Sequence, residues 1–200
     1  MQRLTARCSL LLLAAGVLTA QQYFPPGVLG PDPQSHEFKA DWYSKQLKAL
    51  HEPSLWELSQ TAPNAEVYRF LWLRSFHHPI AIRVVVRASG SSRINSRMTS
   101  GTGGLEPGGI RRYSTSWLRK ALTEELLTAF ANADFWNLPT LLDVNCAPQV
   151  DGAQWIFEGA RNGKYHVIDR WSPNGGDPAR AIGIAALRMA RFKIRSAEIY

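Results

Sequence analysis

The chain has very little cysteine: among its 200 residues, only Cys8 and Cys146 are of this type. Cys8 belongs to an N-terminal segment that we expect to be removed, which would leave Cys146 alone. A single cysteine cannot form an internal disulfide, even in an oxidising compartment. No histidine or other base stands beside Cys146, which favours a small buried apolar residue over a nucleophile. The stability of the chain must therefore come from packing.

The sequence also lacks the common signatures of metal, cofactor and hydrolase sites. No pair of histidines or cysteines has the spacing of zinc ligands, and the adjacent His77 and His78 would point to opposite faces of a strand. The glycine-rich stretch 101–109 lacks the Lys-Ser/Thr ending of a phosphate-binding loop, and neither G-x-S-x-G nor H-E-x-x-H occurs. We predict no metal, no cofactor, and a flexible hairpin loop at 101–109.

The N-terminal apolar run is too short for a membrane anchor. Residues 10–18 are apolar, which is about half the length that spans a bilayer. Arg3 and Arg7 precede the run, and the small residues Thr19 and Ala20 end it, in the order of a secretory signal. We therefore expect cleavage near Ala20, a periplasmic or extracellular protein, and no transmembrane anchor in the mature chain.

Acidic residues are outnumbered by basic ones, 16 against 23, and the formal net charge is +7. Residues 1–20 hold two arginines and no acid, so the mature chain keeps all but two of these positive charges. A basic surface attracts nucleic acid, anionic lipid or acidic polymers, and export excludes nucleic acid as the expected partner. A hydrophobic content of 45% with seven tryptophans argues against disorder. We expect a Pro/Gly-rich extended leader at 21–34 and one globular domain at 35–200.

Hydrophobic periodicity outlines the elements of this domain. Ser35 can cap a first helix that runs to about Leu50, and Asp177 followed by Pro178 begins the last one. Because strands and helices come in runs, their order predicts an α+β fold, with a mostly antiparallel sheet of about five or six strands and helices packed on one face. The other expected elements are strands at 66–76, 80–88, 93–99 and 110–117, a helix at 120–133, and a hairpin of 153–160 and 164–171.

Three stretches resemble a pattern found in a family of uncharacterised exported bacterial proteins. They are FWNLP at 135–139, DGAQWIFEG at 151–159 and YHVIDRWSP at 165–173, which correspond to FWxLP, DGxxWxxEG and YHxxxRWSP. The EPSLW stretch at 52–56 is similar to the same family, and the likeness extends over most of the mature chain. The resemblance implies an exported bacterial protein, but it brings no activity and no functional residues.

The hairpin brings two carboxylates onto one face of the expected sheet. With Asn162-Gly163 as the turn, Glu158 lies opposite Val167 and Asp169 lies opposite Ile156. Glu158 and Asp169 then become diagonal neighbours, roughly 7–8 Å apart at the backbone. Two carboxylates at such a spacing could act as acid and base on a glycosidic bond. The alternative is that they pair with nearby arginines or face water.

Arginines crowd the expected strands and recur at alternate positions. Arg83 and Arg87 share one face of their strand, while the apolar Ile82 and Val84 turn to the other, and Arg97 lies on the next strand. The guanidinium fork suits carboxylate and phosphate groups. We interpret Arg83, Arg87 and Arg97 as ligand-binding residues on a basic sheet face; the alternative is a solvated face balanced by carboxylates.

These patterns favour a non-catalytic binding protein of the bacterial envelope over an enzyme, although they leave the question of catalysis open. The expected partner is an anionic envelope glycan or lipid headgroup that meets the arginine face. One alternative is an envelope polysaccharide hydrolase that uses Glu158 and Asp169. Another is a structural partner of a second envelope protein.

We predict that protein recovered from the cell envelope begins near Gln21, because residues 10–18 are too short to remain as an anchor. N-terminal sequencing of the purified protein measures this directly. Recovery of the chain with Met1 intact, in the membrane pellet, would contradict the expected processing.

Overall fold

The structure is a computed structural model that describes residues 21–142 and 151–200. The expected signal segment 1–20 and the buried position expected for Cys146 lie outside the described residues. Among the helices of the described part, none is both long and apolar enough to cross a membrane.

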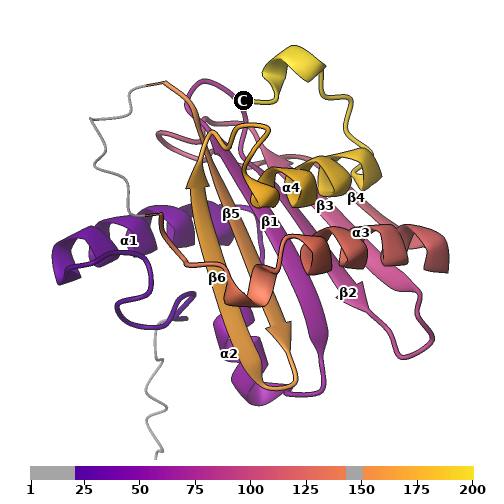
Figure 1. Ribbon diagram of the computed structural model, residues 1–200. Helices are drawn as coiled ribbons and strands as arrows, with labels where there is room; N and C mark the ends of the chain where they lie inside the picture. Colours follow the sequence, from indigo (N-terminus) through magenta and orange to yellow (C-terminus); the bar gives the residue numbers. More distant parts are fainter. Residues whose placement is uncertain (1–20, 143–150) are drawn as a thin grey trace, which may run out of the picture.

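The centre of the fold is a six-stranded sheet in which every neighbouring pair of strands is antiparallel (Figure 1). The strand order is β4-β3-β2-β1-β5-β6, so β1 lies inside the sheet and pairs with both β2 and β5. This arrangement confirms the expected α+β class. The strands are β1 (Glu66–Arg74), β2 (Ile80–Val86), β3 (Ser92–Thr99), β4 (Ile110–Leu118), β5 (Ala153–Arg161) and β6 (Lys164–Trp171).

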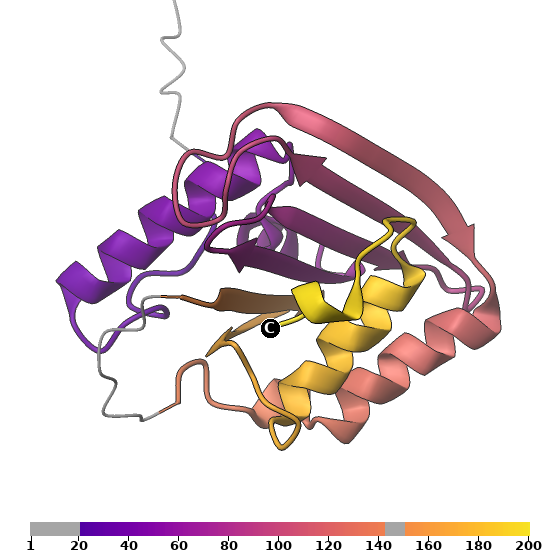
Figure 2. The same ribbon diagram turned by 90° about the horizontal axis from the view of Figure 1, so that it is seen from above.

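Helices lie on both faces of this sheet, as the view from above shows (Figure 2). The helices α3 (Lys120–Asn132) and α4 (Pro178–Met189) pack against one face, as expected. The helices α1 (Pro33–Ala49) and α2 (Leu55–Thr61) lie against the opposite face. The expectation of helices packed on one face therefore describes α3 and α4 but not α1 and α2. The remaining helical elements are two short 3-10 turns, Phe135–Asn137 and Ser196–Glu198.

Under α3 and α4 the sheet presents a large aromatic core. Phe70 on β1 stacks on Phe157 of β5, with ring centroids 4.6 Å apart, and meets Trp155 at 5.1 Å. The helix α4 approaches this cluster closely through Gly183, because a Cβ atom there would come within 2.2 Å of the Trp155 ring. The alternating strand pattern therefore places one continuous apolar surface under these two helices.

Aspartate side chains cap the N-termini of α1 and α4. In α4 the Asp177 carboxylate accepts a hydrogen bond from Ala179 N at 2.9 Å, as expected for its N-cap. In α1 the cap is Asp32, which accepts from Ser35 N at 2.9 Å, and Pro33 occupies the first turn. The expected cap at Ser35 was therefore wrong, because the helix begins one turn earlier.

The Pro/Gly-rich segment 21–34 packs against the core through three buried side chains and is not the unpacked leader that its composition indicated. Tyr23, Phe24 and Leu29 are all buried and belong to the apolar cluster beneath α1. The Tyr23 hydroxyl also donates to the Glu52 carbonyl at 2.9 Å. The packing of these three side chains holds the segment against the core, while its prolines and glycines determine its backbone conformation.

The hairpin of β5 and β6 has the expected turn and register. Asn162 and Gly163 both have positive φ, 53° and 72°, as the tight turn requires. Glu158 pairs with Val167, and Ile156 pairs with Asp169. The two carboxylates therefore share one sheet face, as predicted.

We predict that Gly163→Val lowers the free energy of unfolding by about 1 kcal/mol or more, because a branched side chain is strained at positive φ. The space around the new Cβ is not the cause, since its nearest neighbour would lie 3.6 Å away. Chemical denaturation measures the change. Gly175→Val is the matched control, because Gly175 has no positive φ and its Cβ would meet open space. Equal stability of the two variants would contradict the strained turn.

Candidate functional site

The two carboxylates expected to act on a substrate are both buried beneath the α1–α2 side of the sheet. Asp169 lies under α1, where it accepts hydrogen bonds from Lys39 Nζ at 2.8 Å and the Tyr43 hydroxyl at 2.9 Å. Gln154 Nε2 donates to its second oxygen at 2.9 Å. Burial raises the pKa of Tyr43 well above its usual range, and the negative charge of Asp169 raises it further, so this hydroxyl stays protonated. Asp169 thus fixes α1 to the sheet.

Glu158 is equally occupied by its neighbours. It accepts from Arg69 Nε at 2.7 Å and from the Tyr165 hydroxyl at 2.9 Å. Burial raises the pKa of Glu158, and the Arg69 guanidinium opposes that shift by stabilising the carboxylate. The structure therefore places Glu158 and Asp169 on one face, as predicted, but gives each a full set of protein partners. This arrangement is that of counter-ions within the core.

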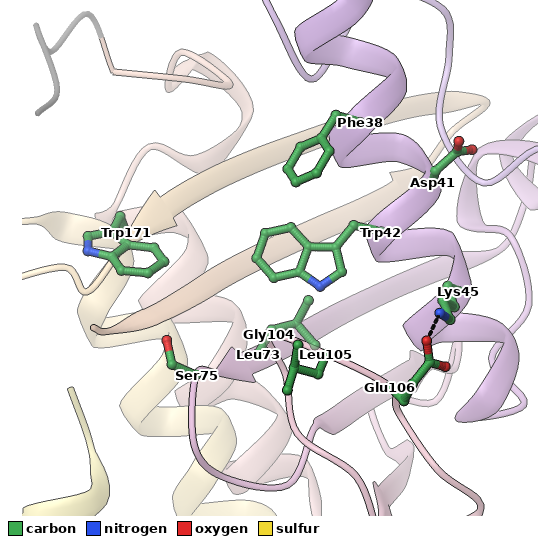
Figure 3. A pocket seen from close by; sticks show the side chains of 10 residues that line it. All are labelled: Phe38, Asp41, Trp42, Lys45, Leu73, Ser75, Gly104, Leu105, Glu106 and Trp171. Carbon is green, nitrogen blue, oxygen red and sulfur yellow. Dashed lines mark hydrogen bonds and ion pairs between the residues drawn. The ribbon is translucent and has the colours of Figure 1, made fainter. Parts of the chain in front are cut away.

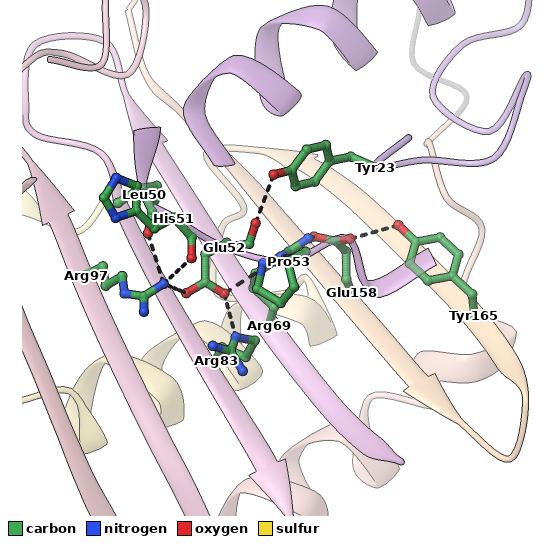
Figure 4. A network of polar contacts seen from close by, with 10 residues as sticks. All are labelled: Tyr23, Leu50, His51, Glu52, Pro53, Arg69, Arg83, Arg97, Glu158 and Tyr165. Carbon is green, nitrogen blue, oxygen red and sulfur yellow. Dashed lines mark hydrogen bonds and ion pairs between the residues drawn. The ribbon is translucent and has the colours of Figure 1, made fainter. Parts of the chain in front are cut away.

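A third buried carboxylate, Glu52, connects the predicted arginines to this network (Figure 4). Glu52 lies between α1 and α2 and accepts from Arg83 Nε at 2.7 Å and Arg97 Nη1 at 3.1 Å. The Nη1 atom of Arg69 lies 3.8 Å from the same carboxylate. Sequence analysis missed Glu52, because nothing in the sequence pattern marks which strands its carboxylate meets.

Arg83 and Arg97 are therefore brought together, but they serve the fold. Arg97 donates to the carbonyls of Leu50 and His51 as well as to Glu52, so it holds the end of α1. Arg83 Nε donates its hydrogen bond to the Glu52 carboxylate. Of the three predicted ligand-binding arginines, Arg87 is the exposed one, and it shares no contact with this network.

Arg87 belongs to a different group of side chains on the same sheet face. Its guanidinium carbon lies 4.1 Å from the centre of the Trp117 ring, and that of Arg93 lies 6.0 Å from the same ring. Trp117 is 55% exposed, and Tyr113, which lies four residues before it on β4, is 76% exposed. This group covers the part of the sheet that lies beyond α1 and α2.

A pocket of about 670 Å³ opens between α1, the loop 100–109 and the ends of β1 and β6. Its aromatic walls are Phe38, Trp42 and Trp171, whose rings surround one hollow, and the aliphatic Leu73 and Leu105 also line it (Figure 3). Phe38 and Leu105 are 69% and 74% exposed, so the pocket is open to solvent. Asp41 lies at the rim and turns away from the hollow.

The glycine-rich loop that borders the pocket joins β3 to β4, as expected of a hairpin loop, and it is also hydrogen-bonded to α1. Trp42 Nε1 donates to the Gly103 carbonyl at 2.8 Å, and Gln46 Nε2 donates to the Leu105 carbonyl at 3.1 Å. Lys45 forms an ion pair with Glu106. Gly103 must be glycine, because a Cβ atom there would lie 2.5 Å from the Arg74 backbone nitrogen.

Phe38 and Trp42 lie in the first helix that the sequence predicted, but the sequence pattern did not reveal the pocket. The only signal was that these aromatic residues lie four positions apart in α1, which places them on one side of the helix. Trp171 and Leu105 complete the walls from segments far along the chain, and no local pattern connects them with α1.

Within residues 21–142 and 151–200, no group of three or more histidine, cysteine or acidic side chains is arranged to hold a metal ion. The Ser75 hydroxyl at the pocket edge donates to the Gly152 carbonyl at 3.1 Å. No protein-family model matches this chain, and no curated protein matches its sequence.

We predict that Glu158→Leu lowers the free energy of unfolding by about 3–5 kcal/mol, because it leaves the buried Arg69 charge without its main partner. Adding Arg69→Met removes that charge and should restore a large part of the loss. Urea denaturation of both variants measures the difference.

The matched control is Glu124→Leu, which breaks an exposed pair with Lys120 and should cost no more than about 1 kcal/mol. If the single and double variants at 158 and 69 were equally unstable, the pairing of these two charges would not be the main interaction.

Proposed function

We propose that the chain is an exported, non-catalytic binding protein of the bacterial envelope, and that its ligand occupies the aromatic pocket beside α1. The observation that carries this proposal is the convergence of Phe38, Trp42 and Trp171 on one open hollow. Open concave sites with apolar and aromatic walls are the usual form of small-molecule sites in proteins. The expected secretory signal at residues 1–20 supports the location.

The pocket favours an uncharged ligand with an apolar ring. Two of its polar edge groups are already engaged, since Trp42 Nε1 binds the Gly103 carbonyl and Lys45 pairs with Glu106, and the Asp41 carboxylate turns away from the hollow. A strongly polar ligand would lose its hydrogen bonds to water and gain few in return. The faces of the aromatic rings, in contrast, are offered to the ligand, and flat rings pack on them in stacked or edge-on geometry.

The burial of the predicted acid pair weighs against the hydrolase alternative. A general acid and base must reach the glycosidic oxygen and a water molecule. The Glu158 carboxylate instead accepts hydrogen bonds from Arg69 and Tyr165. The Asp169 carboxylate accepts them from Lys39, Tyr43 and Gln154. Neither carboxylate lines the aromatic pocket.

The proposal predicts that N-phenyl-1-naphthylamine, a neutral aromatic fluorophore, binds the purified protein with enhanced emission. The double variant Phe38→Ala/Leu105→Ala should bind it about tenfold more weakly, because two apolar walls are removed. Both side chains are largely exposed, so the variant should keep its melting temperature. Fluorescence titration measures the dissociation constant.

The matched control is Phe76→Ala, which removes an aromatic ring that is 70% exposed and lies outside the pocket. It should bind the fluorophore as the unmodified protein does. Equal affinity of all three proteins, or the absence of binding to any of them, would count against the pocket as the ligand site.

A further inference from the structure

Part of the sheet face that carries α1 and α2 is left uncovered by them. The apolar residues beneath α1 come from β1, β2, β5 and β6, and α2 contacts β5 and β6. On β4, and at Arg93 of β3, the side chains of the same face are open to solvent. We call this exposed group the arginine–aromatic face; it consists of Arg87, Arg93, Tyr113, Thr115 and Trp117.

The register of the strands arranges these residues in rows. Arg93 lies opposite Trp117, and Arg97 lies opposite Tyr113. Tyr113, Thr115 and Trp117 follow one another on alternate positions of β4, so they form a row with steps of about 7 Å. A row along a strand matches an extended polymer better than a compact ligand.

The charges of this face are not balanced by acids. In the part of the chain that the structure describes, no carboxylate lies within 4.0 Å of the Arg87 or Arg93 guanidinium. The neighbouring network adds to the excess, because Arg69, Arg83 and Arg97 face only Glu52 and Glu158. The local potential is therefore positive, and an acidic ligand complements it.

We propose that the arginine–aromatic face binds an acidic polysaccharide, and that this site is separate from the aromatic pocket. Guanidinium groups pair with sugar carboxylates in two-pronged contacts. The exposed rings of Trp117 and Tyr113 offer flat surfaces on which sugar rings pack. Among the described residues, the large apolar side chains exposed on this face are these two aromatics, with no aliphatic chain suited to enter a bilayer. This favours a glycan over a lipid surface.

The test uses polygalacturonate as the acidic glycan, dextran as the neutral one, and phosphatidylglycerol vesicles as the lipid. Affinity electrophoresis and calorimetric titration at low salt should show binding to polygalacturonate alone. Arg87→Gln/Arg93→Gln and Trp117→Ala should each weaken it by about tenfold. Added salt should weaken it steeply, because exposed charges are screened over about 10 Å at 0.1 M.

The matched control is Arg188→Gln/Arg191→Gln, which removes the same charge from exposed positions at the α4 side. It should retain binding, and melting temperatures should agree among all variants. Equal weakening by the two arginine pairs would reduce the effect to net charge and overturn the proposal. Binding to the vesicles in place of polygalacturonate would do the same. Fluorophore binding in the pocket should be unchanged by these variants, so the two proposals succeed or fail separately.

Discussion

The buried carboxylate of Glu52 is the point at which the α1–α2 layer is joined to the sheet. It lies in the connection between these helices and meets arginines from β1, β2 and β3. Removal of such a group from water costs several kcal/mol unless its partners are in place. The helical layer is therefore held at one position over the sheet, and a shift along it would leave the Glu52 carboxylate charged and unpaired.

The position of that layer explains both binding regions. Because α1 is held over β1, β5 and β6, its aromatic side chains Phe38 and Trp42 border the pocket, and Trp42 also hydrogen-bonds to the loop 100–109. For the same reason, β3 and β4 extend beyond the helices, and Trp117 and Tyr113 face solvent. On the other face α3 and α4 cover a larger apolar core, and the buried Arg74 and Arg170 of that face pair with Glu198 and Asp177.

Local chemistry made part of this structure predictable from sequence. Asn162-Gly163 determined the hairpin and its register, and Asp177-Pro178 marked the beginning of α4, because both signals act within a few residues. The role of Arg83 could not be predicted in this way, since its partner Glu52 lies 31 residues earlier. The pocket depends on contacts 61 residues apart between Trp42 and Gly103. Alternation identified the faces of the strands, but it could not show which parts of a face the helices would cover.

The central place of β1 in the sheet has a consequence for the order of folding. β1 pairs with β2 within a short hairpin, but its other neighbour is β5, and the pair Arg74 and Ala153 closes a separation of 79 residues. Closing a loop of that length costs about 4 kcal/mol of chain entropy before the new contacts compensate for it. Strand pairing between distant segments is correspondingly slow. The sheet therefore cannot be completed until the C-terminal hairpin is available, and a chain synthesised only as far as residue 152 has β1 without one of its two neighbours.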